Sequence, residues 1–189
     1  LTDLVRIRNG EIVYWPNLGY AKFGAKITMG NAPKFARPDL FKHQRIKLGD
    51  VDGSGTTDIF YIGDEAVFFW FNQSGNSWSD RQEIESFPTV DDVANVQVMD
   101  LLGKGTSCLV WSSPLSRHSN QPMGYVDLMK QGKPHLLTSM DNGMGLKRNI
   151  NYAPSTKFYL QDREKGNPWK TKLPFPVHVV ERTEVHERV

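Results

Sequence analysis

The chain has 189 residues, of which 39% are hydrophobic, enough to bury one sizeable core. Its 23 basic and 21 acidic residues give a net charge of +2 and are interspersed, which argues against the basic field that grips nucleic acid. No apolar run approaches the roughly 20 residues needed to span a bilayer. Cys108 is the single cysteine, so no internal disulfide can form, and we expect it to be a small buried hydrophobe at a strand start.

An internal repeat begins near the start of the chain. An offset of 55 places Asp3 on Asp58, Trp15 on Trp70, Asn17 on Asn72 and Phe23 on Trp78, and an offset of 50 places Asp50 on Asp100, Gly53 on Gly103 and Gly55 on Gly105. The first copy lacks its loop, the second is complete and the third is degenerate. Because the chain starts at Leu1 in mid-repeat, without an initiator Met or a signal segment, we expect a piece of a longer protein.

The loop of the complete copy spans residues 50–58 and reads Asp-Val-Asp-Gly-Ser-Gly-Thr-Thr-Asp. A Ca²⁺ ion takes oxygen ligands at about 2.3 to 2.6 Å, and glycines let a short loop curl around it. The expected ligands are the side chains of Asp50, Asp52, Ser54 and Asp58 with a carbonyl near Thr56. The alternative is a tight glycine turn closed by its own Asp hydrogen bonds. In either case the loop would stiffen the fold rather than perform chemistry.

The residues after this loop predict four short strands. Aromatic and β-branched runs at 58–62 and 66–71 are followed by a turn at 72–76, a polar strand ending near Phe87 and a strand over 93–99 that leads into the next loop. Four antiparallel strands per period of about 50 residues are what a propeller blade requires. We therefore expect an all-β partial β-propeller of about three four-stranded blades. Since a propeller needs at least about four blades, more must lie elsewhere.

The third loop, residues 100–108, keeps its glycines but loses ligand positions. Leu102, Lys104 and Cys108 stand where the second loop has oxygen-bearing side chains, so we expect this loop to bind no cation. The persistence of the glycines indicates that the turn itself matters to the fold. A blade without a metal clamp would be the natural weak seam of a propeller, which gives the hypothesis that this seam opens.

Further along, the repeat register fades into a polar loop over 112–122, followed by expected strands at 125–129 and 135–140. Asn142-Gly143 predicts a hairpin with positive φ at both positions and a returning strand over 146–152. Ser155 or Thr156 should cap a short helix to about Lys165, and a partly exposed strand should cover 177–189. The expected domains are blades at 1–112, last propeller strands and hairpin at 113–153, and the start of another module at 154–189.

The sequence contains no recognisable set of catalytic residues. The five histidines lack metal-site spacing and are expected to be solvated, and Ser112 and Ser113 lack a nucleophile elbow, so we expect no enzyme. The aromatic run at 66–71 lacks polar alternation, which favours a strand buried on both faces over a sugar-stacking surface. Trp78 and Trp169, in polar surroundings, are expected to be exposed contacts.

Two resemblances to known families follow from these residues. The loop at 50–58 with Ile59 resembles the FG-GAP or VCBS repeat, over residues 1 to about 112. Downstream, Met140-Asp141-Asn142-Gly143-Met144-Gly145, Tyr152-Ala153-Pro154-Ser155-Thr156 and Trp169 with Leu173-Pro174-Phe175-Pro176-Val177 look like the B component of bacterial Tc (toxin complex) insecticidal toxins, where the propeller gives way to the middle region that begins the shell.

What the resemblance implies is a non-enzymatic role in a secreted toxin complex. In that family the B component forms a hollow cocoon with the C component around a toxic polypeptide. Its propeller docks on the pentameric A component, and a rearrangement of blades lets the toxin enter the translocation channel. The implied partners are therefore the A and C components. The alternative is a Ca²⁺-dependent adhesion or carbohydrate-binding propeller of a secreted bacterial protein.

Overall fold

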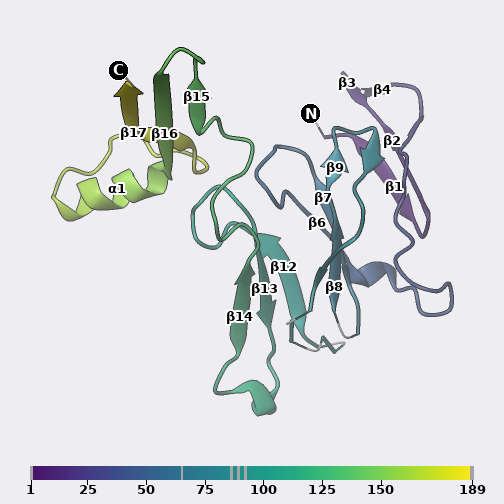
Figure 1. Ribbon diagram of the computed structural model, residues 1–189. Coiled ribbons are helices and arrows are strands. Elements are labelled where there is room, and N and C mark those ends of the chain that lie inside the picture. The colour runs from purple at the N-terminus through teal and green to yellow at the C-terminus, as the bar shows by residue number, and fades with distance from the viewer. Residues whose placement is uncertain (1, 65, 86, 89, 92, 188–189) are drawn as a thin grey trace.

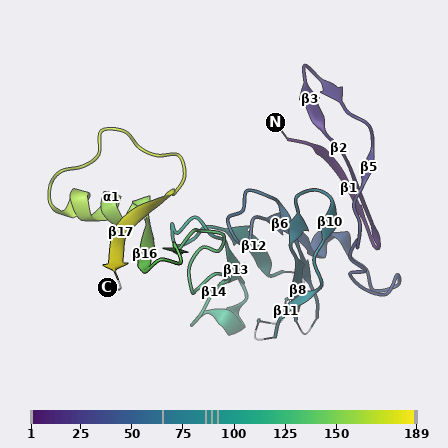
Figure 2. The same cartoon turned by 45° about the horizontal axis from the view of Figure 1, so that its top comes forward.

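The computed structural model describes residues 2–64, 66–85, 87–88, 90–91 and 93–187. The described chain is mostly β, with several small antiparallel sheets and one α-helix, none of the sheets being closed. The sheets follow one another along the molecule in chain order (Figures 1 and 2). No helix in the described ranges is long and apolar enough to cross a membrane.

The first sheet has the strand order β1-β2-β5, formed by β1 (Leu4–Arg8), β2 (Glu11–Trp15) and β5 (Ile27–Thr28). Between β2 and β5 the chain makes a small hairpin from β3 (Asn17–Gly19) and β4 (Lys22–Phe23). A short 3-10 helix, η1 (His43–Arg45), then leads towards the next sheet.

The second sheet has four strands in the order β11-β8-β7-β6. They are β6 (Ile46–Gly49), β7 (Asp58–Ile62), β8 (Val67–Trp70) and β11 (Gln82–Ile84), and the hairpin between β8 and β11 consists of β9 (Asn72–Gln73) and β10 (Ser77–Trp78). The acidic loop therefore joins two neighbouring strands of one sheet, β6 and β7. Strand β6 was missed by the sequence reading, which took the loop as the start of the repeat.

The third sheet has the order β12-β13-β14, from β12 (Asn95–Met99), β13 (Cys108–Ser112) and β14 (Met123–Asp127). The interpretation of 93–99 as the fourth strand of the preceding unit was wrong, because β12 pairs with β13 along five residues. Cys108 is 1% exposed at the start of β13, as expected. The loop at 113–122 carries one further 3-10 helix, η2 (Ser116–His118).

Strand β7 supplies side chains to two separate cores. Ile59 and Tyr61 belong to the cluster shared with the first sheet, whereas Phe60 and Ile62 belong to the cluster shared with the third sheet. Because successive side chains of a strand point to opposite faces, both faces of this sheet are covered by its neighbours. That double burial explains why β7 lacks polar alternation. The core packing expected for the run at 66–71 is confirmed on β8, where Trp70 belongs to the first cluster and Val67 to the second.

The expectation that Trp78 is exposed was wrong. It is 4% exposed and lies in the core between the first two sheets with Met29 and Phe35. Its neighbours in sequence, Ser77 and Ser79, are polar, but residues of the preceding unit cover the ring.

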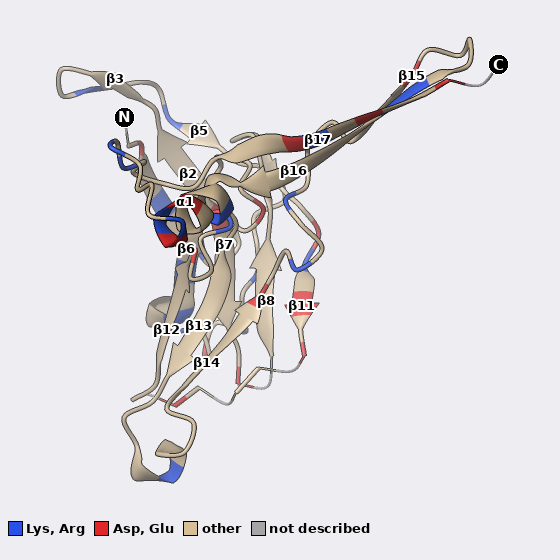
Figure 3. Ribbon diagram, turned by 90° about the vertical axis from the view of Figure 1, so that its left-hand side faces the viewer, with Lys and Arg blue, Asp and Glu red and all other residues tan. Residues whose placement is uncertain are grey.

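The C-terminal part contains a three-stranded sheet and the α-helix. Its strands are β15 (Ser139–Asp141), β16 (Leu146–Pro154) and β17 (His178–Glu187), in the order β15-β16-β17, and α1 spans Ser155–Glu164. Figure 3 shows β16 and β17 as a long ribbon that extends away from the other sheets, with acidic and basic residues along it. Strand β16 pairs with β17. One sheet therefore contains residues from both sides of the domain boundary that the sequence placed between residues 153 and 154.

Several local expectations in this part need adjustment. The hairpin after β15 is present, but its loop covers 142–145 and positive φ occurs at Gly143 and Gly145. The strand expected from residue 135 begins only at Ser139. The helix has no side-chain cap, because the Ser155 hydroxyl accepts a hydrogen bond from the backbone N of Val177 at 3.1 Å.

Candidate functional site

The second loop is closed by its own carboxylates. Asp50 accepts hydrogen bonds from the backbone N of Ser54 at 3.0 Å and of Gly55 at 2.8 Å, and Asp52 accepts a second bond from Ser54 at 2.9 Å. Gly53 and Gly55 have φ of +71° and +89°, a region that favours glycine. The turn therefore forms from residues within the loop itself.

Asp58 ties this loop to the rest of its sheet. Its two carboxylate oxygens accept bonds from the backbone N of Val51 and of Asn72, both at 2.8 Å. The side chain is 1% exposed, and burial, only partly offset by these two bonds, raises the pKa of Asp58 to about 6. This carboxylate thus fastens the loop to the hairpin that follows β8.

The same carboxylates form a group that can hold a cation. One oxygen from each of Asp50, Asp52 and Asp58 lies within 4.8 Å of the others, a spacing that oxygens around one Ca²⁺ ion can adopt. The hydroxyls of Ser54 and Thr56, 2.9 Å apart, lie in the same loop. The sequence reasoning named these five residues, and the structure brings the three carboxylates together. Each carboxylate oxygen accepting one hydrogen bond still has a lone pair for a metal.

The third loop closes in the same way without the ligand oxygens. Asp100 accepts bonds from the backbone N of Lys104 at 2.9 Å and of Gly105 at 2.7 Å, which are the counterparts of the bonds made by Asp50. The Lys104 ammonium lies 2.7 Å from Asp127, which raises the pKa of that lysine. Cys108 occupies the place of Asp58, and burial raises the pKa of its thiol. The turn geometry therefore needs only the first aspartate and the glycines.

The two loops stack on each other between the second and third sheets. The hydroxyl of Ser107 donates to the carbonyl of Asp50 at 2.5 Å, and its backbone N donates to the carbonyl of Val51 at 3.4 Å. A Cβ on Gly53 would lie 2.5 Å from the carbonyl oxygen of Gly105, a backbone atom that cannot easily move aside. Glycine at this position is therefore required by the contact as well as by φ.

The third loop also contacts the C-terminal part. The Thr156 hydroxyl donates to the carbonyl of Gly103 at 2.5 Å, and a Cβ on Gly103 would lie 3.2 Å from the methyl group of Thr156. A Cβ on Gly105 would lie 3.1 Å from the ring of His178. Burial, with the charge of nearby Lys133, lowers the pKa of His178. The loops thus connect the sheets to the start of α1 and of β17.

His135 and Lys133 approach the stacked loops from the segment after β14. His135 has φ of +64° and its Nε2 lies 3.1 Å from Asp52. Burial acts to raise the pKa of Asp52, but the hydrogen bonds from Ser54 and His135 outweigh it and hold the pKa below its usual value. The expectation of solvated histidines holds for His135, whose side chain is 71% exposed despite this contact, and for the exposed His43 and His186, whereas His118 and His178 are partly buried.

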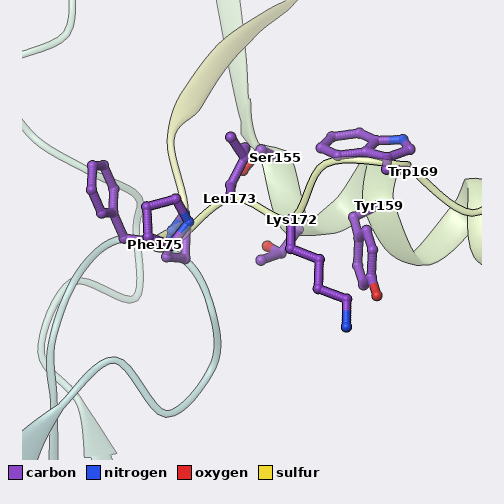
Figure 4. A pocket seen from close by; sticks show the side chains of 9 residues that line it. Ser155, Tyr159, Trp169, Lys172, Leu173 and Phe175 are labelled. Carbon is purple, nitrogen blue, oxygen red and sulfur yellow. The ribbon is translucent and has the colours of Figure 1, made fainter.

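A groove lies beside α1, where Figure 4 shows Tyr159 and Trp169 at one end and Phe175 at the other. Its volume is about 280 Å³. The lining residues are Ser155, Thr156, Tyr159, Trp169, Lys172, Leu173, Pro174, Phe175 and Pro176. Trp169 is half-buried, and its indole N donates to Asp162 at 2.7 Å. The run at 173–176 suggested extended chain, but no sequence signal indicated this groove.

A second hollow of about 370 Å³ lies where the third loop, the segment after β14 and strand β16 meet. It is lined by Lys104, Thr106, Met129, Lys130, Gln131, Gly132, Lys133, Leu136, Thr138, Ile150, Asn151, Tyr152, Pro154 and His178. Three lysines bring positive charge to its walls. Both hollows border the junction between the sheets and the C-terminal part.

Several small antiparallel sheets, joined by glycine loops to a helix and a ribbon, define a mostly β protein. A family described as "Insecticide toxin TcdB middle/N-terminal region" matches residues 72–189. The chain therefore belongs to this family, which makes it a region of a Tc toxin B component. No curated protein matches the chain.

Solved structures show the same relationship over nearly the whole chain. The crystal structures of TcdB2-TccC3 without its hypervariable C-terminal region and of TcdB2-TccC3-Cdc42 are each 30% identical, with a TM-score of 0.85 over 98% of this chain. The Photorhabdus luminescens Tc holotoxin pore is 29% identical, with a TM-score of 0.84 over 98% of this chain. This chain spans 9% of the TcdB2-TccC3 chain and 8% of the matched pore chain.

Proposed function

We propose that this chain is a non-enzymatic binding and gating segment of a secreted bacterial toxin complex. Its first three sheets are consecutive blades of an FG-GAP/VCBS-type β-propeller, and its C-terminal part begins the shell. The propeller docks the cocoon of B and C components onto the A translocation channel and opens to release the toxic polypeptide. The observation that carries the proposal is a repeat unit whose two faces are each buried by a neighbouring unit.

The repeat is supported at the level of individual hydrogen bonds. The backbone N of Asn17 donates to Asp3 at 2.8 Å, as that of Asn72 donates to Asp58 at 2.8 Å. The side-chain amides of the same asparagines donate to carbonyls of Thr2 and Thr57, the residues before those aspartates. Equivalent atoms make equivalent bonds 55 positions apart, which is expected of blades with one ancestral design.

The inner strands of neighbouring units also approach closely. A Cβ on Gly49 of β6 would lie 2.4 Å from the side chain of Val98 on β12, so these two strands pass side by side. Each of them is the first strand of its sheet. First strands of successive blades line the axis of a propeller, and this close approach is consistent with that arrangement.

The seam between the second and third units is the candidate for opening. Within the described residues, its two loops are joined by the two hydrogen bonds from Ser107 and by glycine contacts, and His135 adds one contact to Asp52. Across the first seam, Gly30 and Asn31 make four bonds to the second unit. A stack held by side-by-side contacts can part at one seam while each sheet stays folded.

Hydrogen exchange on the whole B–C complex, free and bound to the A component, tests this function. Binding to A should change protection at the facing loops 50–57 and 100–107 more than inside β7 or β13. Capture of the A component by a protein carrying the whole propeller tests docking separately. Equal protection in both states, together with normal capture, would contradict gating at this seam and leave docking intact.

The second loop is proposed as a cation site that stiffens its unit. Asp50, Asp52 and Asp58, with Ser54 and Thr56, would hold Ca²⁺, and the ion would add rigidity to a turn already closed by backbone donors. No step of docking or opening depends on that ion.

A further inference from the structure

The hairpins of the first two units are equivalent at their base, although a register shift pairs Lys22 with Gly19 in the first whereas Ser77 pairs with Gln73 in the second. In β3–β4 and β9–β10 the strand pairs Asn17↔Phe23 and Asn72↔Trp78 occupy the same place, 55 residues apart. Both hairpins are closed at the base by the same bond, from the backbone N of Gly24 to the carbonyl of Pro16 in one and of Ser79 to that of Phe71 in the other. What lies against the base of one hairpin can therefore be compared with what lies against the base of the other.

A short segment of the first unit covers the hairpin of the second. Gly30 forms a parallel bridge with Ser77: its backbone N donates to the carbonyl of Asn76 at 2.8 Å, and its carbonyl accepts from the backbone N of Trp78 at 3.0 Å. The side-chain amide of Asn31 adds a bond to the carbonyl of Trp78 at 3.0 Å. This segment, Met29–Asn31, closes the edge of the hairpin and buries the indole.

The two backbones meet directly at Gly30. A Cβ there would lie 3.4 Å from Cβ of Ser77 and 3.7 Å from the carbonyl oxygen of Asn76, which are ordinary van der Waals distances, so the contact is made by main-chain atoms and does not require glycine. The segment is thus a main-chain contact with an asparagine clamp, made between two different units of the repeat.

Both hairpins are sheets of two strands, but among the described residues the isolated bridge Gly30↔Ser77 on the second hairpin has no counterpart on the first. Phe23, the counterpart of the 4% exposed Trp78, is 47% exposed. On the adjoining strand β1, Leu4 is 55% exposed, although its counterpart Ile59, which shares a cluster with Trp78, is 1% exposed. The side of the first unit that carries Leu4 and Phe23 is therefore apolar and open.

We propose that the edge of β4 at Lys22–Phe23 is one half of a clasp between repeat units. Its other half is an extended segment of another repeat unit of the same polypeptide, which lies on Lys22–Phe23 as Gly30–Asn31 lies on Ser77–Trp78. A backbone carbonyl of that segment accepts from the backbone N of Phe23, and the amide side chain of its next residue donates to the carbonyl of Phe23. This inference rests on the proposed propeller and specifies how one further unit joins it.

The equivalence of the two hairpins, and not only the exposed apolar surface, indicates which kind of segment covers β4. Since the anchoring bonds of the two hairpins match, the outward-facing backbone groups of Phe23 match those of Trp78, which already bind such a segment. The matched TcdB2-TccC3 chain is about eleven times as long as this one, as this chain spans 9% of it, so there is room for further units.

Photo-crosslinking in the whole B–C complex tests the clasp. Benzoylphenylalanine would replace Lys22 in one variant and Ser77, its counterpart, in the other. The Ser77 variant is the control and should link to residues 28–31, because its Cβ lies next to Gly30. The Lys22 variant should link to an extended segment of another repeat in the same polypeptide, identified by mass spectrometry. A link from position 22 to the A or C component, or no link while position 77 reacts, would overturn the clasp.

Amide exchange supplies a readout without substitution. In the whole complex the backbone N of Phe23 should exchange as slowly as that of Trp78, because both would donate to a carbonyl of a covering segment. Exchange of Phe23 roughly tenfold or more faster than that of Trp78 in the same complex would overturn the proposal. Capture of the A component by the complex is measured in parallel, so loss of the clasp with normal capture separates this inference from the docking function. Absence of the link from position 77 to 28–31 would refute the packing of the first two units and the clasp with it.

Discussion

Substitution of Gly53 by alanine should loosen the seam between the stacked loops. Alanine would have to adopt φ near +71°, which costs about 1 to 2 kcal/mol for a residue with a Cβ. It would also place that Cβ 2.5 Å from the carbonyl oxygen of Gly105, and relief of such an overlap costs about 1 to 3 kcal/mol more. The loops should therefore separate far more often in the Gly53→Ala variant than in the parent.

Gly55→Ala is the matched control. Gly55 has φ of +89° in the same loop, but nothing lies within 4 Å of the position of its Cβ, so only the backbone strain applies. The backbone N of Ser107, which donates across the seam, reports opening by hydrogen exchange in the whole B component. The clash corresponds to about fivefold to 150-fold faster exchange in Gly53→Ala than in Gly55→Ala. Equal rates in the two variants would refute the contact between the loops.

Three further predictions concern the metal, the junction and the core. Added Ca²⁺ should slow amide exchange in the second loop by a factor that grows with its concentration, and Asp52→Asn should weaken this response whereas Asp100→Asn should not. Thr156→Val should cost about 1 kcal/mol at the junction, because the hydroxyl loses its bond to the third loop, seen as faster exchange there. Trp78→Ala should cost about 3 to 5 kcal/mol of local stability, because it leaves a cavity in the core. Trp169→Ala should cost less, because that ring is only half-buried. Equal losses of stability in thermal unfolding would contradict this difference.

The repeat could be predicted because its turns depend on local chemistry. Aspartate, asparagine and glycine at fixed positions make the hydrogen bonds and positive φ angles that close each turn, so the same letters recur wherever the turn recurs. The offset that aligned Asn17 with Asn72 identified two residues that make the same bonds in the structure. Strand β7 could also be predicted, because a short run of large aromatic and β-branched residues favours a buried strand.

What could not be predicted depends on contacts between distant residues. Strand β6 is short and half-exposed, and it becomes a strand by pairing with β7 across the loop. Trp78 is flanked by serines, and its burial comes from a segment 47 to 49 residues earlier in the chain. The Ser155 hydroxyl binds the backbone of Val177, 22 residues away, in place of capping its own helix.

The alternation along β7 makes adjacent positions independent of each other. Ile59 and Phe60 are joined by a peptide bond, yet their side chains belong to different hydrophobic clusters. Truncation of one should disturb the boundary with the first unit, and truncation of the other the boundary with the third, so their effects should add with little coupling free energy. Substitutions in this one strand can therefore weaken the boundary with the first unit or the boundary with the third unit separately.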